Sequence, residues 1–446
     1  MIKRFPVPLY LDVGIIDGKE TIVGIFQGEY LLNGKEKVSG PFSITLEQKK
    51  MCLHVGQKKY ILESEPRFVA SKNSSFLLED VTIGKGFHWE KRERQVFPGN
   101  LKIRIRNDGL FSAINEVVIE DYLKSVISSE MNPLSPLEFL KAHAVSSRSW
   151  LLSKKMKRKK KDVTLESEPK DGRIIKVYGN EEHKLFDVCA DDHCQRYHGI
   201  TKILSNQVEY AVEQTDGLVL VYGDEICDTR YSKCCGGITE KYSIAWEEKE
   251  LPYLLSISDS IETYGPLATE KDLIKWIEGE PKVFCNVRNE EDLSKIVTDL
   301  DEKTKDFFRW KVVVSKEEIE NLIKAKTGID IGEIEKIKPI ARGPSGRIKE
   351  MLIEGTKARF IVGKELEIRR ILSPTHLLSS AFFITEEKDR KGRVKSFILK
   401  GAGWGHGVGM CQIGAARMAL MGYSYQEILA HYFRGAKVAK IYEEKI

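Results

Sequence analysis

Alternation of apolar and polar residues dominates the first 95 residues of the chain. The alternating runs are short and are separated by Gly, Asn and Lys residues that favour turns; they include LDVGII, TIVGIF, FSITLE and KYILES. A period of two is typical of strands with one buried face. Residues 1–95 are therefore predicted to form a small N-terminal β domain. The next run, LKIRIRNDGLFSAINEVVI, contains an Asn-Asp-Gly turn signal and predicts a β-hairpin.

Helical spacing replaces this alternation at residue 120. Val126, Ile127 and Glu130 lie three, four and seven residues after Leu123, so all four share one face of a helix. Pro133 ends this helix. A longer helix, LEFLKAHAVSSRSWLLSKK, follows a capping-box pattern that starts at Ser135.

The second half of the chain mixes both patterns. Strand and turn signals return over 163–245, and charged helical patterns alternate with strand patterns over 246–395. After residue 395 the strand SFILKG leads into a glycine-rich stretch, a helix from about Cys411 to Met421, and a closing helix capped by Ser424. We therefore predict a mixed α/β fold of the α+β class. Its parts are an N-terminal β domain (1–95), a split core (96–245 and 396–446) and an inserted αβ subdomain (246–395).

The stretch GAGWGHGVGM, residues 401–410, places glycine at every second position. It lacks the Lys-Ser/Thr of a phosphate-binding loop and the spacing of a dinucleotide-binding motif. In an extended strand, Trp404 and His406 would share one face, and the other face would be bare backbone. We expect one strand whose Trp404 and His406 face lines a cleft. A packed central strand with Trp404 in the core is the alternative.

Glu130 is the first candidate for chemistry. A carboxyl group on the apolar stripe of a helix is desolvated, which favours its protonated form. A general acid needs such a group in order to protonate a leaving oxygen. The structural alternative is a partly exposed residue of the last helical turn, or an ion pair with a buried arginine such as Arg148.

Cysteine and histidine residues suggest a metal site. The chain has eight cysteines, and five of them fall between residues 189 and 235. A chain of this size needs no disulfides to form a core, so this clustering points to metal or redox chemistry. Two imidazoles and two thiols are the ligand types of a structural zinc site, and they are offered by His183, Cys189, His193 and Cys194. Cys234 or Cys235 could replace one of these ligands, and buried free thiols or a disulfide are the alternatives.

Length and charge exclude some classes of function. With 446 residues the chain is expected to form two or three domains. The net charge of 71 − 66 = +5 is too small to indicate nucleic-acid binding. The basic run KKMKRKKK at 154–161 is predicted to be a solvated helix end, with contact to an acidic polymer as the alternative. The chain contains no run of about 18 apolar residues, so a transmembrane helix is not predicted. The first residues make a poor signal peptide.

Four stretches of the chain resemble the family of stage II sporulation protein D and the amidase-enhancer proteins. They are NEVVIEDYLKSVISSEM, LEFLKAHAVSSRSWLL, YSKCCGGITE and GWGHGVGMCQIGAARMALMGYSYQEILAHYF. The resemblance implies a lytic transglycosylase that cleaves the β-1,4 bond between N-acetylmuramic acid and N-acetylglucosamine in peptidoglycan, with a preference for glycan strands stripped of peptides. Its products would carry 1,6-anhydro ends.

The resemblance also implies roles for individual residues. The family's catalytic glutamate corresponds to Glu130, and its zinc site corresponds to His183, Cys189, His193 and Cys194, here with altered spacing that keeps Cys235 a candidate. We expect the zinc to be structural and Glu130 to act first as acid and then as base. Roles in substrate binding are predicted for Arg148, Trp404, Gly405, His406 and Gly407, in a cleft that joins Glu130 to residues 403–410.

Two other functions remain open at this point. One is a protein without catalytic activity that binds glycan and stimulates a separate cell-wall amidase, and the other is a zinc-dependent hydrolase. The expected partners are peptidoglycan glycan strands and a cell-wall amidase, and nucleic acid is not expected. Because peptidoglycan lies outside the cytoplasmic membrane, the substrate predicts an extracytoplasmic location in the cell envelope, although the sequence shows no leader.

Overall fold

The computed structural model describes residues 4–48, 50–87, 89–157, 172–177, 183–203, 205–298 and 306–443. The fold is mixed α+β, as the sequence predicts. It divides into two compact units, each made of separate chain segments. Unit 1 contains Met1–Leu134, Glu182–Leu218 and Lys440–Ile446, and unit 2 contains Ser135–Glu181 and Val219–Ala439.

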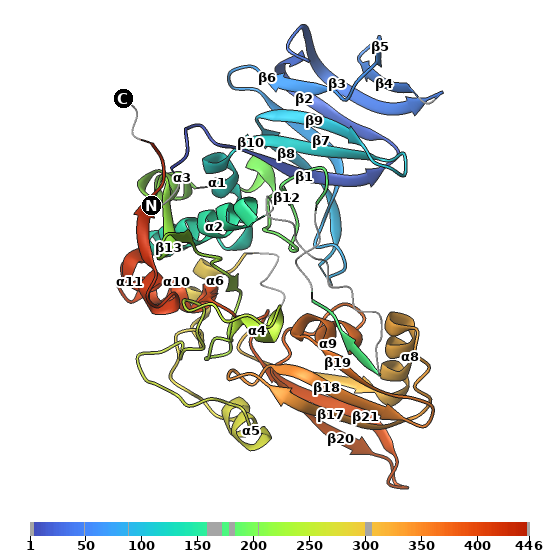
Figure 1. Ribbon diagram of the computed structural model, residues 1–446, viewed down its shortest axis with the longest axis vertical. Helices are drawn as coiled ribbons and strands as arrows, with labels where there is room; N and C mark the ends of the chain where they lie inside the picture. Colours follow the sequence, from blue (N-terminus) through green and yellow to red (C-terminus); the bar gives the residue numbers. More distant parts are fainter. Residues whose placement is uncertain are drawn as a thin grey trace. The chain divides into compact units, whose positions relative to one another are not determined.

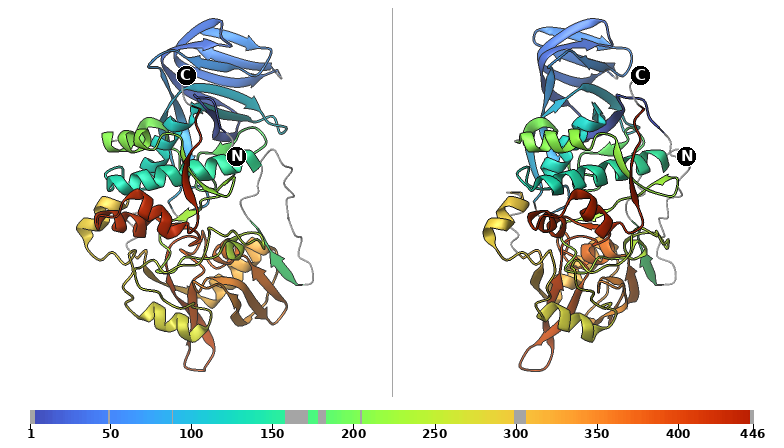
Figure 2. Two further views of the ribbon diagram at one scale, coloured as in Figure 1. Left: turned by 60° about the vertical axis from the view of Figure 1, so that its left-hand side comes forward. Right: turned by 90° about the vertical axis from the view of Figure 1, so that its left-hand side faces the viewer.

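A large, mostly antiparallel sheet forms most of unit 1. Its strands occur in the order β12-β1-β10-β9-β6-β2-β3-β4-β5, and β7 pairs with β2 and β8. In Figures 1 and 2 these strands are drawn in blue and cyan, apart from the green β12. The bounds are β1 Tyr10–Lys19, β2 Ile22–Leu32, β3 Glu36–Glu47, β4 Lys50–Val55, β5 Lys58–Leu62, β6 Arg67–Ala70, β7 Ser75–Ile83, β8 Lys91–Pro98, β9 Asn100–Ile105, β10 Phe111–Val118 and β12 Val188–Cys189.

The alternation in the sequence corresponds to burial in this sheet. Phe26 of β2 stacks on Phe42 of β3 with ring centroids 4.2 Å apart, and both rings are buried. The predicted hairpin is confirmed, because β9 and β10 pair antiparallel around the Asn-Asp-Gly turn. The predicted domain boundary at residue 95 lies inside β8, and the sheet continues beyond it, because β10 pairs with β1.

Helices of unit 1 follow directly from this sheet. α1 (Ile119–Glu130) continues from β10 and packs against β10, α3 (Asn206–Gln214) and the short 3-10 helix Gly199–Lys202. The burial pattern of α1 is the predicted one, since Leu123, Val126 and Ile127 are fully buried. Pro133 lies three residues beyond the last helical residue, as expected for a helix stop.

Unit 2 contains α2 (Leu137–Lys157), which packs against α10 (Gln412–Leu420) and α11 (Tyr425–Tyr432). The predicted capping box of α11 is present: the Ser424 hydroxyl accepts the Glu427 N–H, and the Glu427 carboxylate accepts the Ser424 N–H. The described part of α2 reaches Lys157 in the basic run, and residues 158–161 of that run lie outside the described residues. The shorter helices are α4 Tyr242–Ala245, α5 Glu270–Glu278, α6 Glu290–Ile296, α8 Lys316–Thr327 and α9 Glu365–Ile371.

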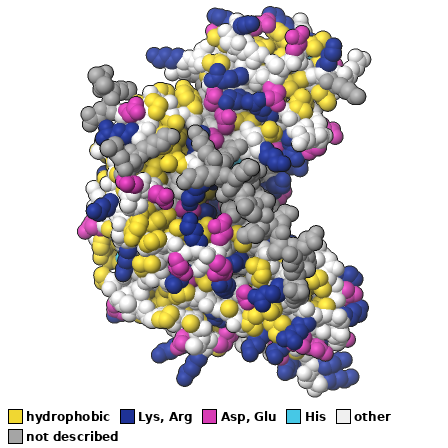
Figure 3. Space-filling model, viewed as in Figure 1, with side chains coloured by type: hydrophobic (Ala, Val, Ile, Leu, Met, Phe, Trp, Pro, Cys, Tyr) yellow, Lys and Arg dark blue, Asp and Glu magenta, His cyan; other side chains and the backbone are white. Residues whose placement is uncertain are grey.

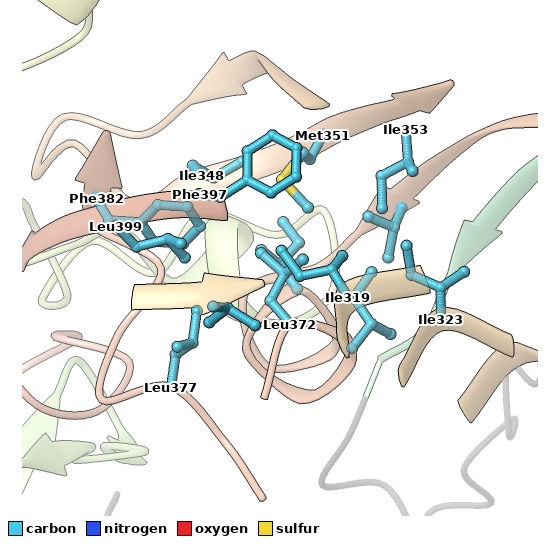
Figure 4. Close-up of a cluster of buried hydrophobic side chains, with 14 of the residues drawn as sticks. Ile319, Ile323, Ile348, Met351, Ile353, Leu372, Leu377, Phe382, Phe397 and Leu399 are labelled. Atoms are coloured by element: carbon cyan, nitrogen blue, oxygen red, sulfur yellow. The ribbon is translucent and has the colours of Figure 1, made fainter. Parts of the chain in front are cut away.

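Two sheets and a buried cluster form the αβ part of unit 2. One sheet has the order β16-β21-β20 and the other β11-β19-β18-β17. Ile319 and Ile323 of α8 pack into a core with Met351 and Phe397, among others (Figure 4). β11 pairs parallel with β19, although nearly 200 residues separate them (Figure 1). The bounds are β11 Arg173–Ile175, β16 Arg309–Ser315, β17 Ile334–Arg342, β18 Ile348–Gly355, β19 Arg359–Gly363, β20 Phe382–Lys388 and β21 Val394–Ala402.

Short β-strands form the remaining strand pairs of the described part of unit 2. β15 (Tyr231–Ser232) pairs parallel with β22 (Met410–Cys411). β13 (Leu218–Tyr222) lies between β14 (Glu225–Ile226) and β23 (Lys437–Lys440). None of the described helices is both long and apolar enough to span a membrane. On the face drawn in Figure 3, basic and acidic side chains are interspersed, in keeping with the small net charge.

Candidate functional site

Glu130 is the last residue of α1 and is nearly buried, with 9% of its surface exposed. It follows Val126 and Ile127 on the apolar face of the helix, as the spacing predicts. Its Oε1 accepts a hydrogen bond of 3.1 Å from the backbone N–H of Arg196. The carboxyl group is therefore held by the segment that follows the His/Cys motif.

Two further hydrogen bonds connect α1 to the same segment. The Tyr122 hydroxyl donates to the side-chain oxygen of Gln195 (3.0 Å), and the backbone N–H of His198 donates to the Ser125 hydroxyl (3.1 Å). Together with the Glu130 bond, they join successive turns of α1 to residues 195–198. Because these groups are buried, the loss of any of them leaves a polar atom without its partner.

The structure brings the four predicted ligands of unit 1 together. One ligand atom from each of His183, Cys189, His193 and Cys194 lies within 4.8 Å of all the others. His183 Nε2 lies 3.3 Å from Cys194 Sγ, and His193 Nδ1 lies 3.5 Å from Cys194 Sγ and 3.8 Å from Cys189 Sγ. Ligands around tetrahedral zinc are about 3.3–3.8 Å apart, from Zn–S of about 2.3 Å and Zn–N of about 2.0 Å. These side chains therefore fit a closed four-ligand site.

The surroundings of Cys189 favour its protonated form. A hydrogen bond with the Cys194 thiol, followed by burial, raises the pKa of Cys189. Two neighbouring thiolates are thus unfavourable in the apo-protein, whereas a bound dication favours both.

Asp191 and Asp192 position the loop that carries these ligands. The Asp191 carboxylate accepts the N–H groups of Gly84 and Lys85 at 2.8 and 2.9 Å. Asp192 pairs with Arg196 at 2.7 Å. These contacts fix the chain on both sides of the predicted His193–Cys194 ligand pair.

The glycine-rich stretch in unit 2 is not the single extended strand predicted from its alternation. β21 ends at Ala402, and Gly403, Gly405, Gly407 and Gly409 all have positive φ, between 74° and 94°. The prediction was wrong because period-two alternation also fits a chain of turns in which every second residue is left-handed. A single strand with one working face and one bare face therefore does not exist here.

Close approach of the protein's own backbone explains the glycines. A Cβ on Gly403 would lie 2.7 Å from the Cys234 carbonyl oxygen, and one on Gly409 would lie 2.1 Å from the Arg230 carbonyl oxygen. Cys234 and Trp404 exchange backbone hydrogen bonds of 3.0 and 2.8 Å. Residues 403–409 thus pack against residues 230–237, and any side chain at Gly403 or Gly409 would separate the two segments.

Trp404 and His406 belong to this packed arrangement. Trp404 is 6% exposed and stacks on Phe307, with centroids 5.3 Å apart and planes 9° apart. The His406 Nδ1 accepts the Val408 N–H at 3.0 Å, and its ring meets Trp246 edge-on at 4.7 Å. Burial, and then nearby arginines, hold the pKa of His406 well below its usual range, so its ring is neutral at pH 7. Trp404 packs as the core alternative describes, and sugar binding by either residue stays a prediction.

Two arginines in the described part of unit 2 are fully buried. Arg347 donates to the Gly405 carbonyl at 2.9 and 3.1 Å and to the Cys235 carbonyl at 3.1 Å, and a Cβ on Gly407 would lie 2.4 Å from its guanidinium. Arg347 was not among the candidate residues of the sequence analysis. Arg148, predicted to bind substrate, is completely buried in α2.

Cys235, named above as an alternative zinc ligand, lies in a different group of side chains. Its thiol clusters with Asp259, Cys285 and Cys411 of unit 2, and Cys234 is the buried neighbour. Sequence reasoning missed this cluster, because Cys285 and Cys411 are isolated in the chain and Asp259 belongs to no motif. Only the count of cysteines could have drawn attention to it.

The structure also contains an open pocket of about 630 Å³ in unit 2. Leu255, Ile261, Tyr264 and Tyr423 contribute apolar surface, and Glu262 and Arg434 contribute charges. None of the five residues predicted to bind substrate lines this pocket.

Comparisons with known proteins match most of the chain. Residues 107–222 match the family described as Stage II sporulation protein, and residues 240–409 match a domain of unknown function (DUF8618). The first match contains α1 with Glu130 and the His/Cys cluster. The second contains the glycine-rich stretch up to Gly409.

Individual relatives extend over both matches. An uncharacterized protein of Brachyspira hyodysenteriae is 27% identical over 76% of this chain and 71% of its own length. The stage II sporulation protein D of Bacillus amyloliquefaciens is 25% identical over 74% of this chain and 76% of its own. The amidase enhancer of Bacillus subtilis is 26% identical over 70% of this chain and 39% of its own. By these matches, this chain is similar to the family of stage II sporulation protein D and the amidase enhancer.

Proposed function

We propose that this protein is a peptidoglycan lytic transglycosylase in which Glu130 is the acid and then the base. Similarity to this family supports a role at the cell wall. The observation that carries the finer proposal is the position of Glu130: a nearly buried carboxyl group, with one oxygen held by the Arg196 N–H, at the end of the matched helix. An enzyme acting on peptidoglycan works outside the cytoplasmic membrane, so we propose an extracytoplasmic location.

The chemistry needs a single carboxyl group. Glu130 donates its proton to the glycosidic oxygen, and the bond from this oxygen to C1 of the N-acetylmuramic acid breaks. The resulting carboxylate then takes the proton of the same sugar's C6 hydroxyl as that oxygen attacks C1. The product is a 1,6-anhydro ring, and no water is consumed. Hydrolytic glycosidases commonly use two carboxylates, whereas intramolecular attack has a high effective concentration without a second one.

A structural zinc ion is proposed at His183, Cys189, His193 and Cys194. When bound, the ion would cross-link the loop. Its role would be structural, because four protein ligands leave no open position for substrate. The loop's own residues do the rest: Arg196 holds one oxygen of Glu130, and Gln195 and His198 fix the helix that carries it. This closed ligand set favours the structural role over a zinc-dependent hydrolase.

The proposal is tested by identifying the product that the protein forms from peptide-stripped glycan strands. We expect the wild-type chain to release fragments with anhydro ends, identified by mass, and Glu130→Gln to reduce their rate at least about 100-fold, the usual minimum for a general acid–base group. Asp121→Asn is the matched control, because Asp121 lies on the same helix in a half-exposed pair with Lys124. It should keep the wild-type rate.

Unchanged glycan, or fragments with hydrolysed rather than anhydro ends, would contradict the proposal. The name of the Bacillus subtilis relative supports a second candidate, a protein that enhances a cell-wall amidase. That function predicts glycan binding without cleavage, and stimulation of an added amidase that persists in Glu130→Gln.

A further inference from the structure

Four buried side chains of unit 2 converge at a point that the proposed function does not use. One ligand atom from each of Cys235, Asp259, Cys285 and Cys411 lies within 4.8 Å of all the others. The Cys235 and Cys285 sulfurs are 3.8 Å apart. Each residue comes from a different segment: the chain after β15, a loop, the connection from α5 to α6, and the start of α10.

This cluster is deeply buried. The four side chains are between 0 and 2% exposed, and Asp259 is completely buried. Among the ion pairs of residues 4–443 that the structure describes, none includes Asp259. Buried carboxylates are normally paired with a cation or bound to a metal, because desolvation of an unpaired charge is unfavourable. None of the described ion pairs therefore supplies a cation to this group of potential ligands.

Arg309, a basic group near these thiols, makes no described ion pair with Asp259. The Arg309 guanidinium is close enough to influence the thiols of Cys235 and Cys285. Its hydrogen bonds, however, go to the backbone carbonyls of Gly236, Trp276, Ile277 and Phe308. It can balance part of the surplus negative charge of a thiolate-rich site, but it leaves the carboxylate unpaired.

Outer hydrogen bonds already orient the potential ligands. The Cys411 sulfur accepts the Cys235 N–H at 3.2 Å, and the Cys235 sulfur accepts the Gly237 N–H at 3.3 Å. Asp259 accepts the Cys285 N–H at 2.8 Å and the Tyr432 hydroxyl at 2.5 Å. Each carboxylate oxygen has a second lone pair available. Metal ligands typically have this kind of support from neighbouring groups.

We propose that Cys235, Asp259, Cys285 and Cys411 form a second metal site that binds one zinc ion. Thiolate ligands select zinc over magnesium or calcium, and thiolate sulfurs around one tetrahedral zinc are about 3.8 Å apart, from Zn–S of about 2.3 Å. The Cys235–Cys285 separation matches that value and is far longer than the disulfide bond length of about 2.05 Å. The ion cross-links the segments that hold the glycine-rich stretch, since Cys235 follows the partner of Trp404 and Cys411 follows Met410.

The experiment counts metal in the full chain, purified without chelator and equilibrated with zinc chloride alone. We expect about two zinc ions per wild-type chain and about one in Cys285→Ser and in Asp259→Asn. Cys227→Ser is the matched control, because Cys227 is a buried thiol of unit 2 outside the cluster. It should keep both ions, and so should Glu130→Gln, which separates this result from the fate of the proposed activity.

Several outcomes would overturn the site. One is that the wild-type chain binds one zinc ion and Cys285→Ser still binds one. Another is a disulfide among the three thiols, which would show as thiols that are protected from alkylation until the protein is reduced. If Cys285→Ser does not fold, Cys194→Ser is loaded with cobalt instead. Retained thiolate-to-cobalt absorption then supports the second site, and its absence overturns it. If neither variant folds, a wild-type count below two ions decides against the site.

Discussion

At the scale of single residues, backbone conformation and close neighbours both require glycine at positions 403, 405, 407 and 409. Each combines a positive φ with a neighbour that a Cβ would contact at 3.0 Å or less. A left-handed conformation alone costs an alanine about 1–2 kcal/mol. The steric overlap adds to this cost, since the segment at 230–237 cannot move away without losing its own backbone hydrogen bonds.

Gly409→Ala should therefore lower the free energy of unfolding of unit 2 by more than about 2 kcal/mol. Gly422→Ala is the control, because Gly422 has a φ of 91° but nothing within 4 Å of its added Cβ. It should cost only about 1 kcal/mol of backbone strain. Urea unfolding followed by tryptophan fluorescence compares the two, and equal losses would contradict the role assigned to the close approach.

The environment of Asp228 predicts how the stability of the protein depends on pH. Burial by itself would raise the pKa of Asp228, but Arg230 and Lys157 outweigh it and hold the pKa below its ordinary value of 3.8. Arg230 binds both carboxylate oxygens, at 2.7 and 3.1 Å. Since the folded pKa is lowered, this stabilisation is fully present above pH 3.8 and is lost as the pH falls through the folded pKa.

Asp228→Asn should thus cost about 1.5–3 kcal/mol at pH 7, the usual contribution of charged hydrogen bonds. The difference from wild type should stay constant down to about pH 4 and shrink below it. Asp330→Asn, at an exposed pair with Lys357, is the control and should change stability much less. Urea titrations at several pH values measure both, and a gap that widens on acidification would contradict the assignment.

At the scale of elements, α11 depends on its N-terminal cap. Ser424 and Glu427 satisfy each other's backbone N–H groups, which no helical carbonyl reaches. Ser424→Ala should lower the free energy of unfolding by about 1 kcal/mol, and Ser424→Asp should restore it because aspartate caps equally well. Thermal unfolding of the three chains gives the comparison. A loss that persists in Ser424→Asp would show that the cap is not its source.

α1 and the His/Cys loop also act as a pair. The described hydrogen bonds of Tyr122, Ser125 and Glu130 lead to residues 195–198, directly after the proposed ligands His193 and Cys194. The order of this loop therefore decides how firmly the Glu130 carboxyl group is held.

At the scale of the whole molecule, unit 1 is made of segments that are far apart in the sequence. Residues 183–218 belong to the same unit as the first 134 residues, whereas 172–177 belong to unit 2. A disturbance at the ligand cluster should spread by contact within unit 1 rather than along the chain.

Cys194→Ser should therefore speed amide exchange in α1 and in residues 195–203, with exchange in residues 172–177 and in unit 2 unchanged. The physical reason is the loss of cross-linking by the proposed zinc ion, whose binding energy is available only to the folded loop. Hydrogen exchange read by mass spectrometry makes the measurement, with Cys52→Ser, a buried thiol of the N-terminal sheet, as the control. Faster exchange in 172–177 alone would contradict the prediction.

The sequence by itself determined the elements whose signals are local. Period-two alternation identified the strands of the large sheet and the β9–β10 hairpin, and helical spacing placed Glu130 on the buried face of α1. The capping box of α11 was also readable, because both partners lie within one turn. The ligands of the first cluster lie within 12 residues, so spacing and residue type were enough to group them.

Only the tertiary structure decided what depends on residues far apart in the chain. The turns at 403–409 follow from the close approach of residues 230–237 and from Arg347, which local alternation cannot reveal. The same is true of Asp259, Cys285 and Cys411, which are unremarkable in the sequence and meet Cys235 only through folding. Local patterns determine an element where its signals lie within a few residues, whereas packing between distant segments determines the backbone at 403–409 and the membership of the Cys235 cluster.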